Sequence, residues 1–156
     1  MARRTLGSLA VVLLILASAA CSRELKPDRK GVWAASSGVL VELQPAGMDT
    51  EWTDEGFAIP YFSGDPPKVK QGDFYFILYG DYQVTDLKAF RQGRNRWELD
   101  TEVTGLNTQL ETLGMKGEPE MQIARFTKML HPGVFVLEVQ QAGAPMSYPF
   151  TVASGY

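Results

Sequence analysis

The sequence holds one cysteine, one histidine and no apolar run long enough for a membrane span, which needs about 20 residues. Since Cys21 is alone, the fold contains no internal disulfide, and its stability has to come from burial and strand pairing. A zinc site needs three or four ligands, and nucleophilic catalysis needs a base beside its nucleophile. His131, beside Pro132 in a predicted exposed turn, has neither a second histidine nor a G-x-S-x-G motif to act with. We therefore predict no cofactor and no enzymatic activity.

Positive charge is also in short supply. The chain has 15 Lys and Arg against 18 Asp and Glu, a formal net charge of −3. Removal of residues 1–20 would take two arginines and no acid, which leaves a net charge of −5. An acidic chain lacks the electrostatic footprint of a nucleic-acid-binding protein, so we predict no nucleic-acid partner.

The first twenty-one residues are the most informative part of what is present. Arg3 and Arg4 form a short basic start, residues 6–17 are almost wholly apolar, and three small residues lead into Cys21. This order is typical of a secretory signal peptide, whose apolar segment has roughly 7–15 residues. We predict cleavage after Ala20.

The motif Ser18-Ala19-Ala20-Cys21 resembles the lipobox of bacterial lipoproteins, with Ser18 where Leu is usual. The resemblance implies a diacylglyceryl thioether on Cys21, which then anchors the protein in a lipid bilayer through its acyl chains. Several chains hold a protein firmly, whereas one binds only reversibly. Ser22 stands where an Asp often retains such proteins at the inner membrane, so the resemblance favours the outer membrane and its periplasmic face. An ordinary signal peptide that leaves a free thiol is the alternative.

Three parts follow from these boundaries: a cleaved signal peptide over 1–20, a lipidated N-terminus and flexible tether over 21–30, and one domain over 31–156. The third part is long enough for a single hydrophobic core. Glycine, proline and aromatic residues are plentiful, and long helical patterns are scarce. We predict an all-β fold, a two-sheet antiparallel sandwich of about eight to nine strands with room for one short helix.

The strongest strand signal is residues 73–82, DFYFILYGDY, which are apolar on both faces and therefore predict a central strand covered on both sides. Residues 31–35 and 39–44 predict a hairpin. Residues 57–62 contain Pro60 and predict an edge strand. Residues 45–56 read as a polar connection.

Two later segments are less clear. Residues 107–116 fit a short helix or a strand, and residues 120–130 alternate in a way that favours a strand. The pattern Leu130-x-Pro132-Gly133-x-Phe135-x-Leu137 resembles the corner before a late strand of immunoglobulin-like and fibronectin-like domains. Those domains often carry Tyr where this chain has Phe135. The resemblance implies an immunoglobulin-like sandwich.

Charged side chains provide two candidate sites. The loop with Asp49, Glu51, Asp54 and Glu55 is the best candidate for calcium, which takes six to eight oxygen ligands. A solvated acidic loop is the alternative, and we favour it because the spacing is not that of an EF-hand. A basic cluster near Phe90 and Trp97 could bind acidic groups, although charge is expected in a turn anyway; it consists of Lys88, Arg91, Arg94 and Arg96.

Aromatic residues provide the other candidates. Tyr75, Tyr79 and Tyr82 lie on the strongest predicted strand with Phe74 and Phe76, and are candidate ligand-binding residues if one face is an exposed ledge. Core packing is the alternative that we favour. A second candidate patch, on the predicted edge strand, consists of Phe57, Tyr61 and Phe62 beside Gly64 and Pro66.

Three functions remain open. The first is a membrane-anchored, noncatalytic interaction or assembly module that docks an envelope protein through a sheet face or an edge strand. The second is a module that binds glycan or peptidoglycan fragments through exposed aromatic residues. The third, an enzyme using carboxylates such as Glu118 and Glu120, ranks last because nothing pairs them with a pocket.

Overall fold

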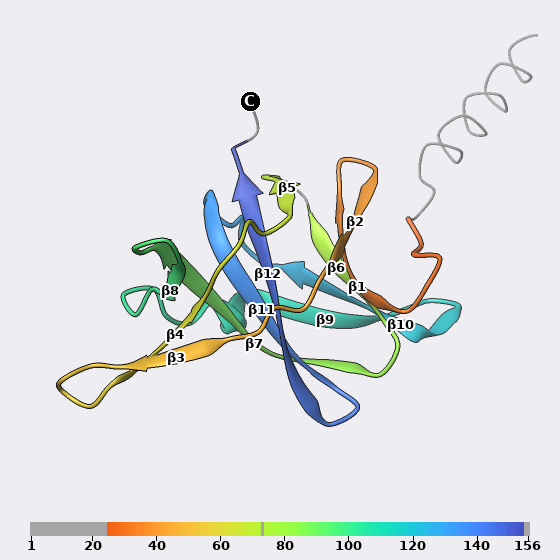
Figure 1. Cartoon of the computed structure of the whole chain (residues 1–156). Coiled ribbons are helices and arrows are strands. Elements are labelled where there is room, and N and C mark those ends of the chain that lie inside the picture. The colour runs from red at the N-terminus through yellow and green to blue at the C-terminus, as the bar shows by residue number, and fades with distance from the viewer. Residues whose placement is uncertain (1–24, 73, 155–156) are drawn as a thin grey trace, which may run out of the picture.

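The computed structural model describes residues 25–72 and 74–154 (Figure 1). The predicted signal peptide, the cleavage residue Ala20 and the lipid-attachment residue Cys21 lie outside these ranges. The regular structure of the described chain consists of strands and one 3-10 turn, and the strands form one five-stranded and one seven-stranded sheet. The predicted all-β, two-sheet sandwich is therefore confirmed.

The five-stranded sheet has the order β2-β1-β6-β10-β9. Its strands are β1 (Gly31–Ser36), β2 (Val39–Leu43), β6 (Tyr75–Tyr79), β9 (Leu110–Met115) and β10 (Glu118–Phe126). All its ladders are antiparallel.

The seven-stranded sheet has the order β3-β4-β8-β7-β11-β12-β5. Its strands are β3 (Asp49–Trp52), β4 (Ala58–Phe62), β5 (Lys68–Lys70), β7 (Tyr82–Gln92), β8 (Trp97–Leu99), β11 (Gly133–Gln141) and β12 (Ala144–Ala153). The described residues thus form more strands than the sequence predicts, because short polar strands such as β3 and β5 carry no apolar alternation. The sandwich is also not purely antiparallel, since β5 pairs in parallel with β12.

The predicted strand 73–82 is in fact divided between the two sheets. β6 ends at Tyr79, and the next strand begins at Tyr82 in the other sheet. Gly80 has a φ of 123°, a conformation that side-chain-bearing residues rarely adopt, and it lets the chain turn between the layers. The central position predicted for this segment is confirmed for β6, which lies in the middle of its sheet.

The structure also assigns the two segments that the sequence left unclear, residues 107–116 and 120–130. A single 3-10 turn, Leu106–Gln109 (η1), precedes β9, and residues 118–126 form β10. Pro60 lies in β4, which is not an edge strand as predicted, because β3 flanks it. Pro60 stands opposite Thr50 of β3, and β8 pairs only with Tyr61 and Phe62, so the proline needs no N–H on the β8 side.

The main core lies between the sheets and is rich in phenylalanine. Phe76 and Phe150 are completely buried, with ring centroids 5.1 Å apart. Phe135, from the predicted corner, stacks on Phe150 at 5.7 Å. Phe135 is thus part of the main core, and the immunoglobulin-like assignment stays a prediction.

A second apolar cluster lies on the other face of the five-stranded sheet. It contains Trp33, Ala35, Ile77, Met115, Met121 and Ile123. Residues 25–30, which we name the strap, lie against it: Leu25 packs on the cluster and Pro27 is buried. The extra covering layer predicted for the central strand is therefore formed partly by a segment that the sequence assigned to a flexible tether.

Charged groups hold the strap on both sides. Lys26 contacts Glu118 at 2.8 Å and Lys30 contacts Glu120 at 4.0 Å, both on β10. On the opposite side Arg29 pairs with Glu42 of β2. The arginine also covers Trp33, whose indole N–H donates to the Arg29 carbonyl at 3.3 Å. The tether prediction does not hold for residues 25–30, and residues 21–24 lie outside the described ranges.

We expect the stability of the domain to depend on Tyr148 at high pH. Burial, together with the neighbouring Tyr82, raises the pKa of Tyr148 to about 12. An unfolded tyrosine loses its proton near pH 10. The free energy of unfolding should therefore fall as the pH rises from about 10 to about 12. Urea midpoints measured across this range should fall less steeply for Tyr148→Phe, and equal slopes would contradict the assignment.

Candidate functional site

The β3–β4 hairpin, residues 49–62, projects from one end of the molecule (Figure 1), and we name it the arm. Its strands pair from Asp49 opposite Tyr61 to Trp52 opposite Ala58. The Thr53 N–H donates to the Phe57 carbonyl at 2.8 Å, and the Phe57 N–H donates to the Thr53 hydroxyl at 3.0 Å. These bonds give the tip one defined conformation.

Two large aromatic side chains are exposed at this tip. Trp52 is 70% exposed and Phe57 is 69% exposed, the two highest values among the exposed large hydrophobic residues of the described chain. Every residue of β3 is exposed. Large aromatic side chains left in water on a projecting element make this tip a candidate contact site for another molecule.

The arm is acidic. Asp49 and Glu51 lie on β3, and Asp54 and Glu55 lie in the turn, while residues 31–67 include no Lys or Arg. Among the described residues, no group of three or more His, Cys, Asp or Glu side chains could hold a metal ion. The calcium candidate is therefore not supported, because an extended hairpin spreads its carboxylates along its length.

Arg96 braces the base of the arm. Its guanidinium pairs with Glu51 of β3, donates to Glu98 at 2.9 Å and lies 4.1 Å from the ring centre of Tyr61. These two carboxylates raise the pKa of Arg96 above its ordinary value. The arm is thus held to β8 at its base, and its position relative to the sheet is set before any partner binds.

The predicted basic cluster does not form a joint site. Arg96 is used in the brace, and Lys88 lies 3.3 Å from Glu138 and 4.0 Å from Asp86. Arg91 and Arg94 are exposed. Charge that is paired within the chain is not available to an acidic ligand.

The predicted tyrosine ledge is only partly accessible. Tyr75 and Tyr79 are half-buried beside the second apolar cluster, and the Arg125 guanidinium lies 5.6 Å from the Tyr75 ring centre. Tyr82 is 8% exposed and lies in the main core. Tyr82 is therefore wrong as a surface ligand contact, because the turn at Gly80 carries it into the other sheet.

The second predicted patch is also divided. Phe57 is exposed at the arm tip, Tyr61 lies under Arg96, and Phe62 is 3% exposed with its ring 5.3 Å from that of Phe90. Of these three residues only Phe57 is exposed at the arm tip, where Trp52 is exposed as well. The sequence reasoning missed Trp52, because it took residues 45–56 as a polar connection.

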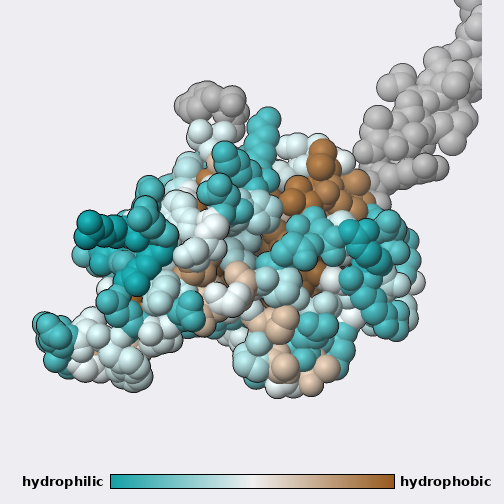
Figure 2. All heavy atoms as spheres, viewed as in Figure 1, coloured by the Kyte–Doolittle hydropathy of each residue, from teal (hydrophilic) through white to brown (hydrophobic). Residues whose placement is uncertain are grey.

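Residue hydropathy does not mark the arm as a contact site either. In Figure 2 the arm is mostly white and teal, whereas the strongest hydrophobic colour lies near the β1–β2 hairpin. Val39, at the start of β2, is 58% exposed. A tryptophan scores as nearly neutral, so an exposed one does not stand out. The useful signal was the spacing in Trp52-Thr53-Asp54-Glu55-Gly56-Phe57, two aromatic residues flanking a turn.

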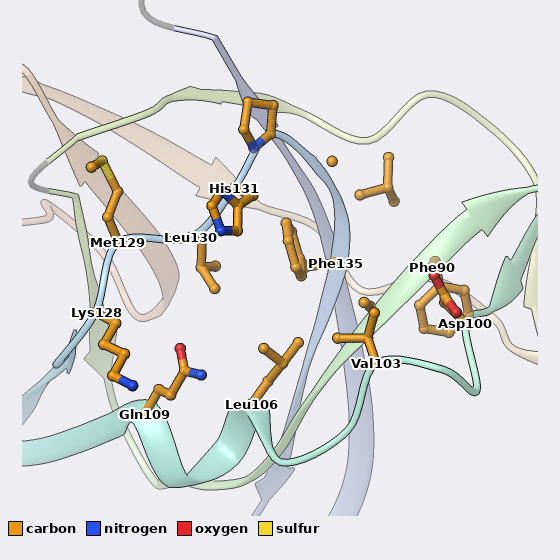
Figure 3. A pocket seen from close by; sticks show the side chains of 14 residues that line it. Phe90, Asp100, Val103, Leu106, Gln109, Lys128, Met129, Leu130, His131 and Phe135 are labelled. Carbon is orange, nitrogen blue, oxygen red and sulfur yellow. The ribbon is translucent and has the colours of Figure 1, made fainter.

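The remaining candidates lie elsewhere. Glu118 and Glu120 contact the strap and are not brought into a pocket. His131 is exposed at the rim of a hollow formed by residues of η1, the loop before it and the β10–β11 connection (Figure 3). The acid-base pair that the enzyme hypothesis requires is not formed by these three residues.

Comparison with models of protein families, with curated proteins and with solved structures found no match to this chain. Within residues 25–72 and 74–154, no helix has the length and apolar character to cross a membrane.

Proposed function

We propose that this chain is a lipid-anchored envelope lipoprotein that acts as a noncatalytic protein-interaction module, with the arm as its contact surface. The exposure of Trp52 and Phe57 on a braced, projecting hairpin carries the proposal. Tryptophan and other aromatic residues dominate the binding energy of many protein interfaces, because they bury a large area at a small cost in side-chain entropy.

The charges around the tip indicate the chemistry of the partner. Trp52 and Phe57 lie beside Asp54 and Glu55, and Glu51 precedes them on β3. A complementary surface would offer an apolar pocket surrounded by Lys and Arg side chains. The same acidic residues disfavour insertion of the tip into an anionic lipid surface.

The arm also offers a second kind of contact, because its strand β3 forms one edge of the seven-stranded sheet. β3 is the last strand of the seven-stranded sheet, so no other strand of the described ranges pairs with one side of its backbone. A partner strand can pair along such an edge, and the side chains beside it then determine specificity. The charges of Asp49 and Glu51 on this strand disfavour pairing with a second copy of the same edge.

The position of the strap indicates that the arm points away from the end of the molecule that carries the proposed lipid anchor. Figure 1 shows the strap and the arm at opposite ends of the molecule. Cys21, the proposed site of lipid attachment, precedes the strap by only a few residues. We place the anchor in the outer membrane, on its periplasmic face, from the resemblance to bacterial lipoproteins and from Ser22.

A photo-crosslinking experiment tests the arm. Phe57 is replaced by a photoreactive phenylalanine analogue in the full chain, expressed in its own envelope, and a matched variant carries the analogue at Leu113, which is 48% exposed on β9. We expect one discrete protein adduct from position 57 and none from position 113. Trp52→Ser should weaken the interaction by about 30-fold, since truncation of a central aromatic residue costs about 2 kcal/mol or more.

Val39→Ser removes a similarly exposed apolar side chain elsewhere and should leave the adduct unchanged. Equal adducts from positions 57 and 113, or an adduct that survives Trp52→Ser, would contradict the proposal. An adduct with cell-wall fragments in place of protein would favour the glycan-binding alternative.

A further inference from the structure

The hollow beside His131 lies at the end of the sandwich, where the chain between β8 and β9 meets the chain between β10 and β11 (Figure 3). Its volume is about 330 Å³. This is near the lower bound of about 300 Å³ for pockets that hold small molecules. The hollow is separate from the arm and is not used in the proposed function.

The floor of the hollow is apolar and belongs to the folded core. Leu106 is 9% exposed, Leu130 is 3% exposed and Phe135 is 7% exposed. In Figure 3 these three side chains face the hollow from different segments of the chain. Side chains held by the core give the floor a shape that exists before any ligand binds.

The rim carries apolar side chains that the fold leaves in water. Met129 is 64% exposed and Val103 is 42% exposed, although both line a hollow with an apolar floor. Methionine is flexible and polarisable, so it can close over ligands of different shape. An apolar ligand would cover both side chains. Removal of their apolar surface from water would then stabilise the complex.

The polar groups are distributed unequally around this rim. Lys128 and Gln109 lie at one end of the hollow in Figure 3, and Asp100 lies at the other. Within the described residues Lys128 makes no ion pair, whereas an Asp100 carboxylate oxygen accepts a hydrogen bond from the Glu102 N–H at 3.1 Å. An ammonium and an amide beside an apolar hollow suit a carboxylate attached to an apolar body.

We propose that this hollow binds a small amphipathic carboxylate, with its apolar chain on Leu106, Leu130 and Phe135 and its carboxylate at Lys128 and Gln109. About 330 Å³ corresponds to roughly ten water-sized volumes of about 30 Å³ each. The size is that of a short fatty acid such as octanoate. The proposal does not depend on the arm or on lipid attachment.

The test is a titration followed by NMR. The probe is octanoate, and the protein is the mature chain 21–156 with Cys21→Ser, so that no detergent competes for the hollow. We expect saturable shifts of the backbone amides of residues 103–109 and 128–135. Octylammonium, which has the opposite charge on a similar chain, should bind at least tenfold more weakly.

Variants separate the charge from the apolar contacts. Lys128→Ala should weaken octanoate binding roughly tenfold, as expected for loss of a hydrogen bond to a charged group, and should leave octan-1-ol binding unchanged. Met129→Glu should abolish octanoate binding, because it places a like charge at the rim. Both residues are exposed, so the variants should fold.

Lys116→Ala and Leu113→Glu are the matched controls, since both alter exposed side chains away from the hollow. They should bind octanoate as the parent does. Shifts that do not saturate, equal binding of octylammonium, or full octanoate binding by Lys128→Ala would each overturn the proposal.

Discussion

Replacement of Phe150 by alanine should lower the free energy of unfolding by about 3–5 kcal/mol, the usual cost of removing a buried phenylalanine. Phe150 is completely buried, and its ring lies 5.1 Å from Phe76, 5.7 Å from Phe135 and 6.1 Å from Phe74. These rings come from both sheets and from the chain before β6, so the cavity would loosen the packing between the two layers. A domain of this size has a total stability of only about 5–15 kcal/mol.

Urea unfolding of the mature chain with Cys21→Ser measures this effect. Phe57→Ala is the matched control, because the same atoms are removed from a side chain that is 69% exposed. Its free energy of unfolding should stay within about 0.5 kcal/mol of the parent value. Similar losses for the two variants would show that Phe150 is not part of a rigid core.

Replacement of Cys21 by serine should move the protein from the membrane fraction to the soluble fraction. The thioether needs the cysteine sulfur, and each buried CH₂ group of an acyl chain contributes about 0.8 kcal/mol to membrane binding. With two or three chains lost, we expect almost no protein to stay with the membrane. Intact-mass measurement should show a lipid mass increase on the parent protein and none on Cys21→Ser.

Ser22→Ala is the control for this experiment, since it changes the neighbouring residue and keeps the sulfur. It should retain the lipid mass and the membrane location. A parent protein that is soluble and unmodified would remove the anchor from the proposed function. The crosslinking result at Phe57 would still report on the arm, so the two parts of the proposal can fail separately.

In the sequence the strap lies between Cys21, the proposed site of lipid attachment, and β1, the first strand of the domain. The ion pairs that it makes with Glu42, Glu118 and Glu120 lie on both sides of the central strands of the five-stranded sheet. Surface ion pairs of this kind are individually weak, about 0–1 kcal/mol each. The burial of Pro27 and the packing of Leu25 therefore contribute more to holding the strap than the charges do.

Local patterns in the sequence predicted several strands of the five-stranded sheet. The predicted hairpin of residues 31–35 and 39–44 matches β1 and β2, and the alternation of residues 120–130 predicted the strand that the structure forms over 118–126 as β10. These patterns could not divide residues 73–82 between two sheets, because aromatic residues continue on both sides of Gly80. Because of that division Tyr82 lies in β7 and is buried in the main core.

The candidate site was harder to predict than the fold. Trp52 and Phe57 are apolar residues of a kind that is usually buried, and nothing local in the sequence states that the hairpin projects beyond the sheet. The brace at Arg96 joins Glu51 to Glu98 across 47 positions of the chain, so only the folded molecule brings them together.

By itself, the sequence determined that this protein is a β-structure without internal disulfides, because strand periodicity and cysteine count are local or compositional properties. Only the tertiary structure decided that the strap covers one sheet face, that the arm exposes two aromatic side chains, and that a hollow opens beside His131. Each of these depends on which surfaces meet when the two sheets pack. The exposure of a side chain depends on how the two sheets pack, so it cannot be predicted from the order of residues along one strand.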